Sequence, residues 1–154
     1  MNRRVLREVV LKALYAVESG GNSPEEALKG IVVAELEQME PIQFAEQLFL
    51  RTVDGSGEYD RIVSEHIRNW KLDRLAILDK LILRMALCEF LRFGEIPVKV
   101  TMNEAIELAK RYSTRRSGYF INGILDAALK RLLEEGRIEK HGRGLQDFSE
   151  EKSI

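Results

Sequence analysis

The sequence contains few of the residues that stabilise folds through covalent or metal bonds. Its 154 residues include one cysteine, Cys88, and two histidines, which excludes an internal disulfide and a Cys/His metal set. Only three prolines interrupt the chain, so there is room for long helices. No apolar run approaches the roughly 18 residues of a membrane span, and the amino terminus has no signal-peptide core. We therefore expect a cytoplasmic globular protein that binds no membrane and no metal.

Catalytic residue patterns are also missing. The sequence has no glycine-rich phosphate loop, no Ser–His–Asp or His–Cys set, and no clustered carboxylates with a partner histidine. These absences predict a protein that is not an enzyme and needs no cofactor.

The net charge of −1 hides an uneven distribution. Residues 1–20 carry four basic and two acidic side chains, a balance of +2. Residues 21–70 carry four basic and ten acidic side chains, a balance of −6. Residues 71–135 carry twelve basic and nine acidic side chains, a balance of +3. The last nineteen residues carry four basic and four acidic side chains. This asymmetry favours a polyanion bound near the first helix and the carboxy-terminal half. An uneven solvated surface would explain the same numbers.

The first helix is predicted from about Arg3 to Ser19, where two glycines end it. At about 100° per residue, its apolar stripe consists of Leu6, Val10, Ala13 and Val17. The flank beside that stripe consists of Arg4, Arg7, Leu11 and Tyr15. Arginines beside an aromatic ring suit single-stranded RNA, because guanidinium groups pair with phosphates and a base stacks on the ring. The alternative is a solvated basic flank with Tyr15 at its edge.

The stretch from Ile96 to Asp126 is predicted to form a helical hairpin. Thr101 and Glu104 have the spacing of a capping box, which predicts a helix beginning at Met102. Residues 113–117 then supply a turn before a last helix, whose inner side consists of Phe120, Ile124, Leu125, Ala128 and Leu132. Two glycines in that helix, Gly118 and Gly123, predict close packing against another backbone.

The remaining pattern is helical as well. Ser23 and Pro24 predict the start of a second helix that runs to about Glu37, Pro41 predicts a third, and a glycine-rich break at 54–57 precedes a fourth. The segment 77–91 is apolar nearly all round, which is typical of a central helix. Lys80 and Arg84 on that helix need an acidic partner, and Glu104 is a candidate partner for Arg84.

These elements predict an all-α protein made of two packed helical subdomains of the three-helix type. We place the first at 1–70, with the arginine-rich first helix, and the second at 71–135. The polar segment 136–154 has no core pattern and is predicted to be mobile.

Three blocks of the sequence resemble the NusB family of transcription antitermination factors. The run IPVKVTMNEAIELAKRY followed by SGYFINGILD is similar to the family's carboxy-terminal signature. Upstream, ILDKLILRMALCEFL is similar to its central helix and RRVLREVVLKALY to its arginine-rich first helix. The resemblance implies binding of the boxA element of ribosomal-operon RNA together with NusE, a ribosomal protein. The complex would help RNA polymerase resist termination.

The resemblance also implies site residues. Arg3, Arg4, Arg7 and Tyr15 match the family's RNA face, and Tyr112 and Phe120 match aromatic positions around the turn before the last helix. Asp79 matches an acidic position that faces NusE, although the family has the longer Glu there.

Two departures from the family pattern affect charge. Val5 stands where some relatives carry another arginine, and Arg115 and Arg116 stand where relatives often have acidic residues. The two arginines are therefore further candidates for RNA contact. The alternative function is a helical homodimer whose contact hides the arginine helix.

Overall fold

The structure is a computed structural model that describes residues 3–37, 42–67 and 72–147, and these residues contain helices and turns but no strand. The predicted all-α fold is confirmed. In the described residues no helix is long and apolar enough to cross a membrane.

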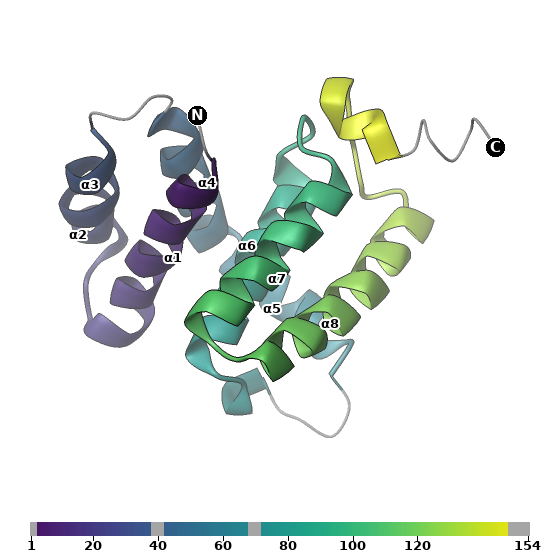
Figure 1. Cartoon of the computed structure of the whole chain (residues 1–154), viewed down its shortest axis with the longest axis horizontal. Helices are drawn as coiled ribbons and strands as arrows, with labels where there is room; N and C mark the ends of the chain where they lie inside the picture. The colour runs from purple at the N-terminus through teal and green to yellow at the C-terminus, as the bar shows by residue number, and fades with distance from the viewer. Residues whose placement is uncertain (1–2, 38–41, 68–71, 148–154) are drawn as a thin grey trace.

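The first half of the chain forms a layer of helices around α1 (Arg3–Gly20) (Figure 1). The second helical segment consists of α2 (Pro24–Ala27), the π-helical η1 (Leu28–Val33) and α3 (Ala34–Leu36). The predicted start of this segment is confirmed, because Ser23 and Glu26 form a capping box. Then come α4 (Ile42–Asp54) and α5 (Ser56–Ser64), separated by Gly55 alone. The predicted role of Pro41 lies outside the described residues.

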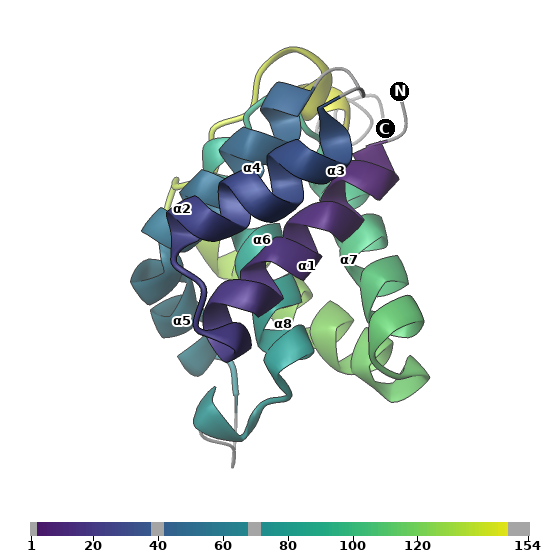
Figure 2. The same ribbon diagram turned by 90° about the vertical axis from the view of Figure 1, so that its left-hand side faces the viewer.

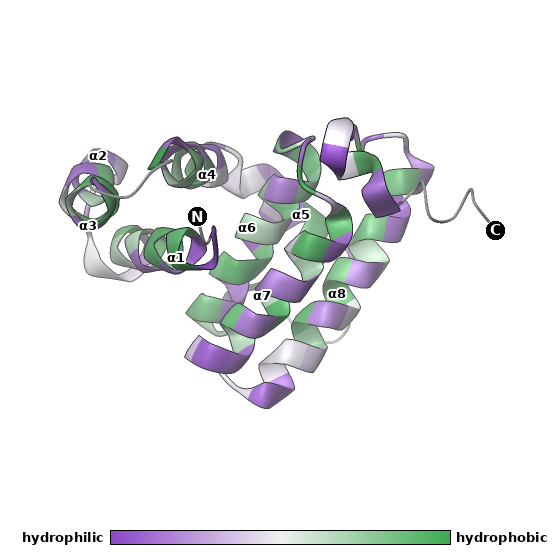
Figure 3. Ribbon diagram, turned by 45° about the horizontal axis from the view of Figure 1, so that its top comes forward, coloured by the Kyte–Doolittle hydropathy of each residue, from purple (hydrophilic) through white to green (hydrophobic). Residues whose placement is uncertain are grey.

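The second half is built on α6 (Ile77–Arg92), which follows the short 3-10 helix η2 (Leu72–Arg74). All residues from 81 to 90 are buried, because α1, α4, α5, α7 and α8 all pack against α6. Figure 3 shows hydrophobic and hydrophilic bands that alternate along α7 and α8, as is typical of helices with one buried side. The prediction of a central helix is confirmed.

Helices α7 (Val98–Tyr112) and α8 (Arg115–Glu134) form the predicted hairpin. Thr114 caps α8 by accepting a hydrogen bond from the Ser117 backbone N–H. Gly118 is buried and lies against Lys110 of α7, but a Cβ on Gly123 would meet no atom within 4 Å. The atoms nearest to a Cβ on Gly118 belong to side chains of α7, at 3.4–3.7 Å, so the predicted close packing against another backbone is not found there, and it is wrong for Gly123.

The predicted start of α7 is wrong. The helix begins one turn earlier, at Val98, because Pro97 already has an extended backbone and serves as the N-cap residue. Thr101 lies inside the helix with its side chain buried. Its hydroxyl donates a hydrogen bond of 2.9 Å to Oε1 of Glu89 on α6.

The boundary between two subdomains remains a prediction. A single cluster of buried hydrophobic residues runs through both halves of the chain. Helix α5, which belongs to the first predicted subdomain, has more of its contacts with α6 than with α4. Beyond α8 the chain continues to the 3-10 helix η3 (Gly142–Leu145), which lies at the same end of the molecule as the start of α1 (Figures 1 and 2).

Candidate nucleic-acid interface

Arg7 is buried and joins α1 to α6. Its side chain donates two hydrogen bonds of 2.8 Å to the carboxylate of Glu89, from Nε to Oε2 and from Nη2 to Oε1. Burial alone would lower the pKa of Arg7, but the hydrogen bonds and charge of Glu89 outweigh it and the pKa is raised. The prediction that Arg7 lies on an exposed flank is therefore wrong. The flank is covered because α6 and Phe44 of α4 pack over it.

Arg4 stays at the surface, with 48% of its side chain exposed. It forms two hydrogen bonds, of 3.0 and 3.1 Å, with the carboxylate of Glu104 on α7. The pairing of Glu104 with Arg84 is thus wrong. Arg84 instead bonds both oxygens of Asp60 at 2.7 Å.

Glu18 of α1 is the acidic partner that the two basic residues of α6 require. One of its carboxylate oxygens lies 3.0 Å from Lys80 Nζ and the other 3.1 Å from Arg84 Nη1. Burial would raise the pKa of Glu18, but these two hydrogen bonds lower it. The repulsion between Lys80 and Arg84 is therefore offset by an acid on the first helix.

Side chains of α1 and α7 together form a mixed basic and aromatic surface, which we call the α1–α7 face. From α1 it includes Arg4, Lys12 and Tyr15, and from α7 it includes Arg111 and Tyr112. Arg111 Nη1 bonds Glu8 Oε1 across the two helices at 2.7 Å. The side chains of both tyrosines are exposed, and burial together with a hydrogen bond to Glu8 raises the pKa of Tyr112.

Arg3 extends this face toward the amino terminus. Its guanidinium lies 4.3 Å from the ring centroid of Phe44, within the range of a cation–π contact. The contact holds the guanidinium against the ring, and Arg3 remains partly exposed. Such a group is ready to bind a phosphate.

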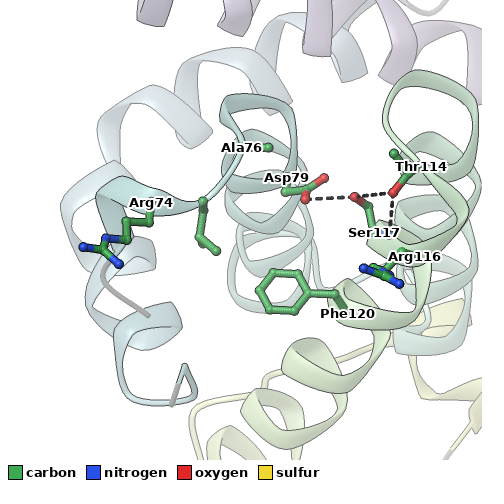
Figure 4. Close-up of a pocket in the computed structure, with 8 residues that line it drawn as sticks. Arg74, Ala76, Asp79, Thr114, Arg116, Ser117 and Phe120 are labelled. Atoms are coloured by element: carbon green, nitrogen blue, oxygen red, sulfur yellow. Dashed lines mark hydrogen bonds between the residues drawn. The ribbon is translucent and has the colours of Figure 1, made fainter. Parts of the chain in front are cut away.

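The other predicted residues lie around a different feature, a pocket between α6 and α8 (Figure 4). Asp79 lies in it, 7% exposed, and its Oδ2 accepts a hydrogen bond of 3.0 Å from the Ser117 hydroxyl. Its Oδ1 has no hydrogen-bond partner among the described residues. Phe120, Leu75 and Ala76 give the pocket apolar walls, and Arg116 lies at its edge.

The structure thus divides the predicted site residues into two groups. Arg3, Arg4, Tyr15 and Tyr112 belong to the α1–α7 face. Phe120 and Arg116 instead share the pocket of Asp79, and Arg115 is exposed beside it in the first turn of α8.

Sequence reasoning missed Arg111 and Lys12 as members of the face. Arg111 directly precedes Tyr112, so the basic-aromatic pair Arg111–Tyr112 was the available signal. Lys12 lies three residues before Tyr15 and so shares its side of the helix. Lys12 Nζ is 2.8 Å from Glu35 Oε1.

Comparison with known proteins gives the family of the chain. The profile of the NusB family matches residues 4–130. The chain belongs to the NusB family. The transcription antitermination protein NusB of Salinibacter ruber is 47% identical over 145 residues, which is 94% of this chain and 91% of that protein.

Two solved structures are also similar. NusB of T. maritima has a TM-score of 0.76 and 34% identity, over 84% of this chain and 92% of the other. A crystal structure of antitermination factors NusB and NusE in complex with dsRNA contains a chain with a TM-score of 0.74 and 25% identity. That match covers 84% of this chain and 96% of the other.

Proposed function

We propose that this protein binds boxA-containing RNA of ribosomal operons together with NusE, and that the complex helps RNA polymerase resist termination. The observation that carries the proposal is the α1–α7 face, where exposed basic groups and two exposed tyrosines lie on packed helices. A NusB of similar fold has been solved together with NusE and RNA. The protein would act by binding and assembly, without chemistry.

The residues of the face have different parts in this proposal. Arg3, Arg4 and Arg111 supply guanidinium groups for phosphates, while Tyr15 and Tyr112 supply rings on which bases stack. Glu104 and Glu8 hold two of these arginines in place and would exchange them with phosphates when RNA arrives. Arg7 is buried, so it would support the face from below by fixing α1 on α6.

The pocket of Asp79 is the proposed contact for NusE. A buried carboxylate oxygen without a partner costs about 1–3 kcal/mol, and a donor from another protein would remove that cost. Apolar walls beside the carboxylate suit a side chain that has an apolar stem and a polar end.

The test is a binding measurement with a boxA RNA and a scrambled RNA of equal length, each with and without NusE. We expect the boxA RNA to bind more tightly and NusE to strengthen its binding. The coupling is reciprocal, so RNA should tighten NusE binding by the same factor. Equal affinity for both RNAs in the presence of NusE would contradict the proposal.

Light scattering of the same samples tests the alternative of a homodimer with a hidden arginine helix. A dimer that persists and does not bind RNA would favour that alternative. A 1:1:1 complex of protein, NusE and RNA would rule it out.

A further inference from the structure

The carboxy-terminal segment 137–147 is bonded to the body of the protein, and we call it the clasp. Lys140 Nζ donates hydrogen bonds to the backbone carbonyls of Glu89, at 3.1 Å, and Phe93, at 2.9 Å. The last carbonyls of a helix have no partner within it, so Lys140 satisfies the end of α6. Asp147 Oδ2 accepts a hydrogen bond of 2.9 Å from the Lys99 backbone N–H in the first turn of α7.

The middle of the clasp approaches the α6–α7 loop at two glycines. The His141 backbone N–H donates to the Gly94 carbonyl at 3.0 Å. A Cβ on Gly94 would lie 2.7 Å from the His141 ring, and a Cβ on Gly144 would collide with the Gly94 carbonyl. The two backbones therefore meet in one register. A side chain at Gly144 is excluded, and one at Gly94 would have to displace the His141 ring.

This register places Arg143 beside the amino-terminal arginines. Arg143, Arg3 and Arg4 line one open hollow of about 580 Å³. The hollow lies at the end of the molecule where η3 and the start of α1 both lie (Figure 2). Arg143 is exposed, and its side chain has no ion-pair partner among the described residues.

Two acidic residues, Glu95 and Glu104, line the same hollow, and in the described part of the chain neither forms an ion pair with Arg143. Glu104 is held by Arg4 through two hydrogen bonds. Glu95 acts on Lys140, whose ammonium it stabilises. Arg7 lines the hollow as well, but its guanidinium is held by Glu89. Arg3, Arg4 and Arg143 therefore present three further guanidinium groups to a space that is open to solvent, which suits a phosphate backbone.

We propose that the clasp is part of the RNA-binding surface and that Arg143 binds an RNA phosphate next to those bound by Arg3 and Arg4. This proposal rests on the proposed function and extends the RNA path to a segment beyond the 4–130 match to the family. Lys140, Gly94 and Gly144 are positioning residues, because they fix where Arg143 lies.

The test compares the salt dependence of RNA binding among variants of the full chain, with a boxA RNA and NusE present. Each phosphate contact contributes about 0.7 to the slope of log affinity against log salt concentration on a single strand. Arg143→Gln should lower affinity and reduce this slope by about 0.7. Arg61→Gln, an exposed arginine of α5 that lies outside the hollow, is the matched control and should change neither.

Lys140→Met tests whether the clasp positions Arg143. It should reduce the slope by a similar amount, and adding Arg143→Gln to it should cause little further loss. If Lys140→Met leaves the slope unchanged, and the double variant has the same slope as Arg143→Gln alone, then Arg143 does not depend on the clasp. That part of the proposal is then overturned. The Arg143→Gln result stands by itself if Lys140→Met proves too unstable to measure.

The double variant Arg3→Gln/Arg4→Gln separates this proposal from the function on which it rests. If it lowers the slope while Arg143→Gln behaves like Arg61→Gln, the clasp proposal is overturned and the proposed function stands. If the Arg3/Arg4 double variant also leaves affinity and slope unchanged, the proposed function itself fails at this face.

Discussion

Arg7 and Glu89 are 82 residues apart in the sequence and form a buried ion pair with two hydrogen bonds of 2.8 Å. The pair connects the first helix to the central helix, and the Thr101 hydroxyl adds a third bond to the same carboxylate. Glu89 is therefore the point at which α1, α6 and α7 are joined by polar groups. The helix that carries the proposed RNA face is held in place by this carboxylate.

Removing the arginine should be costly. Arg7→Met leaves the Glu89 carboxylate buried without its cation, which should lower the free energy of unfolding by about 3–5 kcal/mol. Urea denaturation measures the change. The double variant Arg7→Met/Glu89→Leu removes both charges and should be more stable than Arg7→Met alone. Wild-type stability in Arg7→Met would show that the pair does not form.

Thr101→Val should also destabilise the protein. Thr101 is not a helix cap, so the loss comes from its hydrogen bond to Glu89. The change keeps the side-chain shape and removes a hydrogen bond to a charged group, which contributes about 1.5–3 kcal/mol. Thr101→Ser keeps the hydroxyl and is the control. In a Glu89→Gln background the effect of Thr101→Val should shrink. An effect of unchanged size there would mean that the hydroxyl does not act through Glu89.

Asp79→Asn should weaken NusE binding and leave RNA binding by the protein alone nearly unchanged, because the pocket between α6 and α8 is separate from the α1–α7 face. Calorimetric titration with NusE and with RNA measures both steps. Asp126→Asn removes the same charge at an exposed position of α8 and serves as the control. Equal losses in both titrations would show that Asp79 has a structural role through Ser117.

Arg115 and Arg116 test how far the RNA extends along the protein. If both bind phosphates, changing the pair to Glu should lower affinity and reduce the salt slope by more than one, at about 0.7 for each lost contact. Lys130→Glu/Arg131→Glu makes the same charge change near the other end of α8 and is the control. An unchanged slope would mean that the RNA leaves the protein before this turn.

Lys140 gives the protein a pH dependence of defined sign. Burial lowers the pKa of Lys140 to about 8, against the opposing charges of Glu89, Glu95 and Asp147. Between about pH 8 and 10.5, the ordinary pKa of a lysine, the unfolded chain binds more protons at this group than the folded one. The contribution of Lys140 to stability should therefore rise with pH across this window.

The measurement compares urea denaturation of the wild type and Lys140→Met at pH 7.5 and pH 9.5. The methionine variant cannot titrate at this position, so the wild type should gain stability relative to it at the higher pH. A difference that stays constant between the two pH values would contradict the lowered pKa.

The sequence predicted those parts of the fold that depend on nearby residues. Ser23, Pro24 and the apolar stripe of the first helix act within one or two turns, and the structure has these helices where they were expected. The segment 77–91 is apolar nearly all round and therefore also predicted that α6 lies at the centre of the fold, because such a helix has no face suited to water.

The parts that failed depend on contacts distant in sequence. Thr101 and Glu104 have the spacing of a capping box, but each has a tertiary partner, Glu89 and Arg4 respectively. Nothing local to Arg7 shows that an acid 82 residues later will bury it. Helical periodicity gives the direction of a side chain, and which helix covers it is decided by the tertiary fold.

The Arg7–Glu89 pair also bears on how the chain is made. At a synthesis rate of about 5–20 residues per second, the ribosome adds Glu89 roughly 4–16 s after Arg7. Until then the first helix has no buried partner for its guanidinium, and Arg7 stays in water beside Arg3 and Arg4. A nascent amino-terminal half therefore displays a more basic helix than the finished protein does. The arrival of the central helix removes one of those charges from the surface.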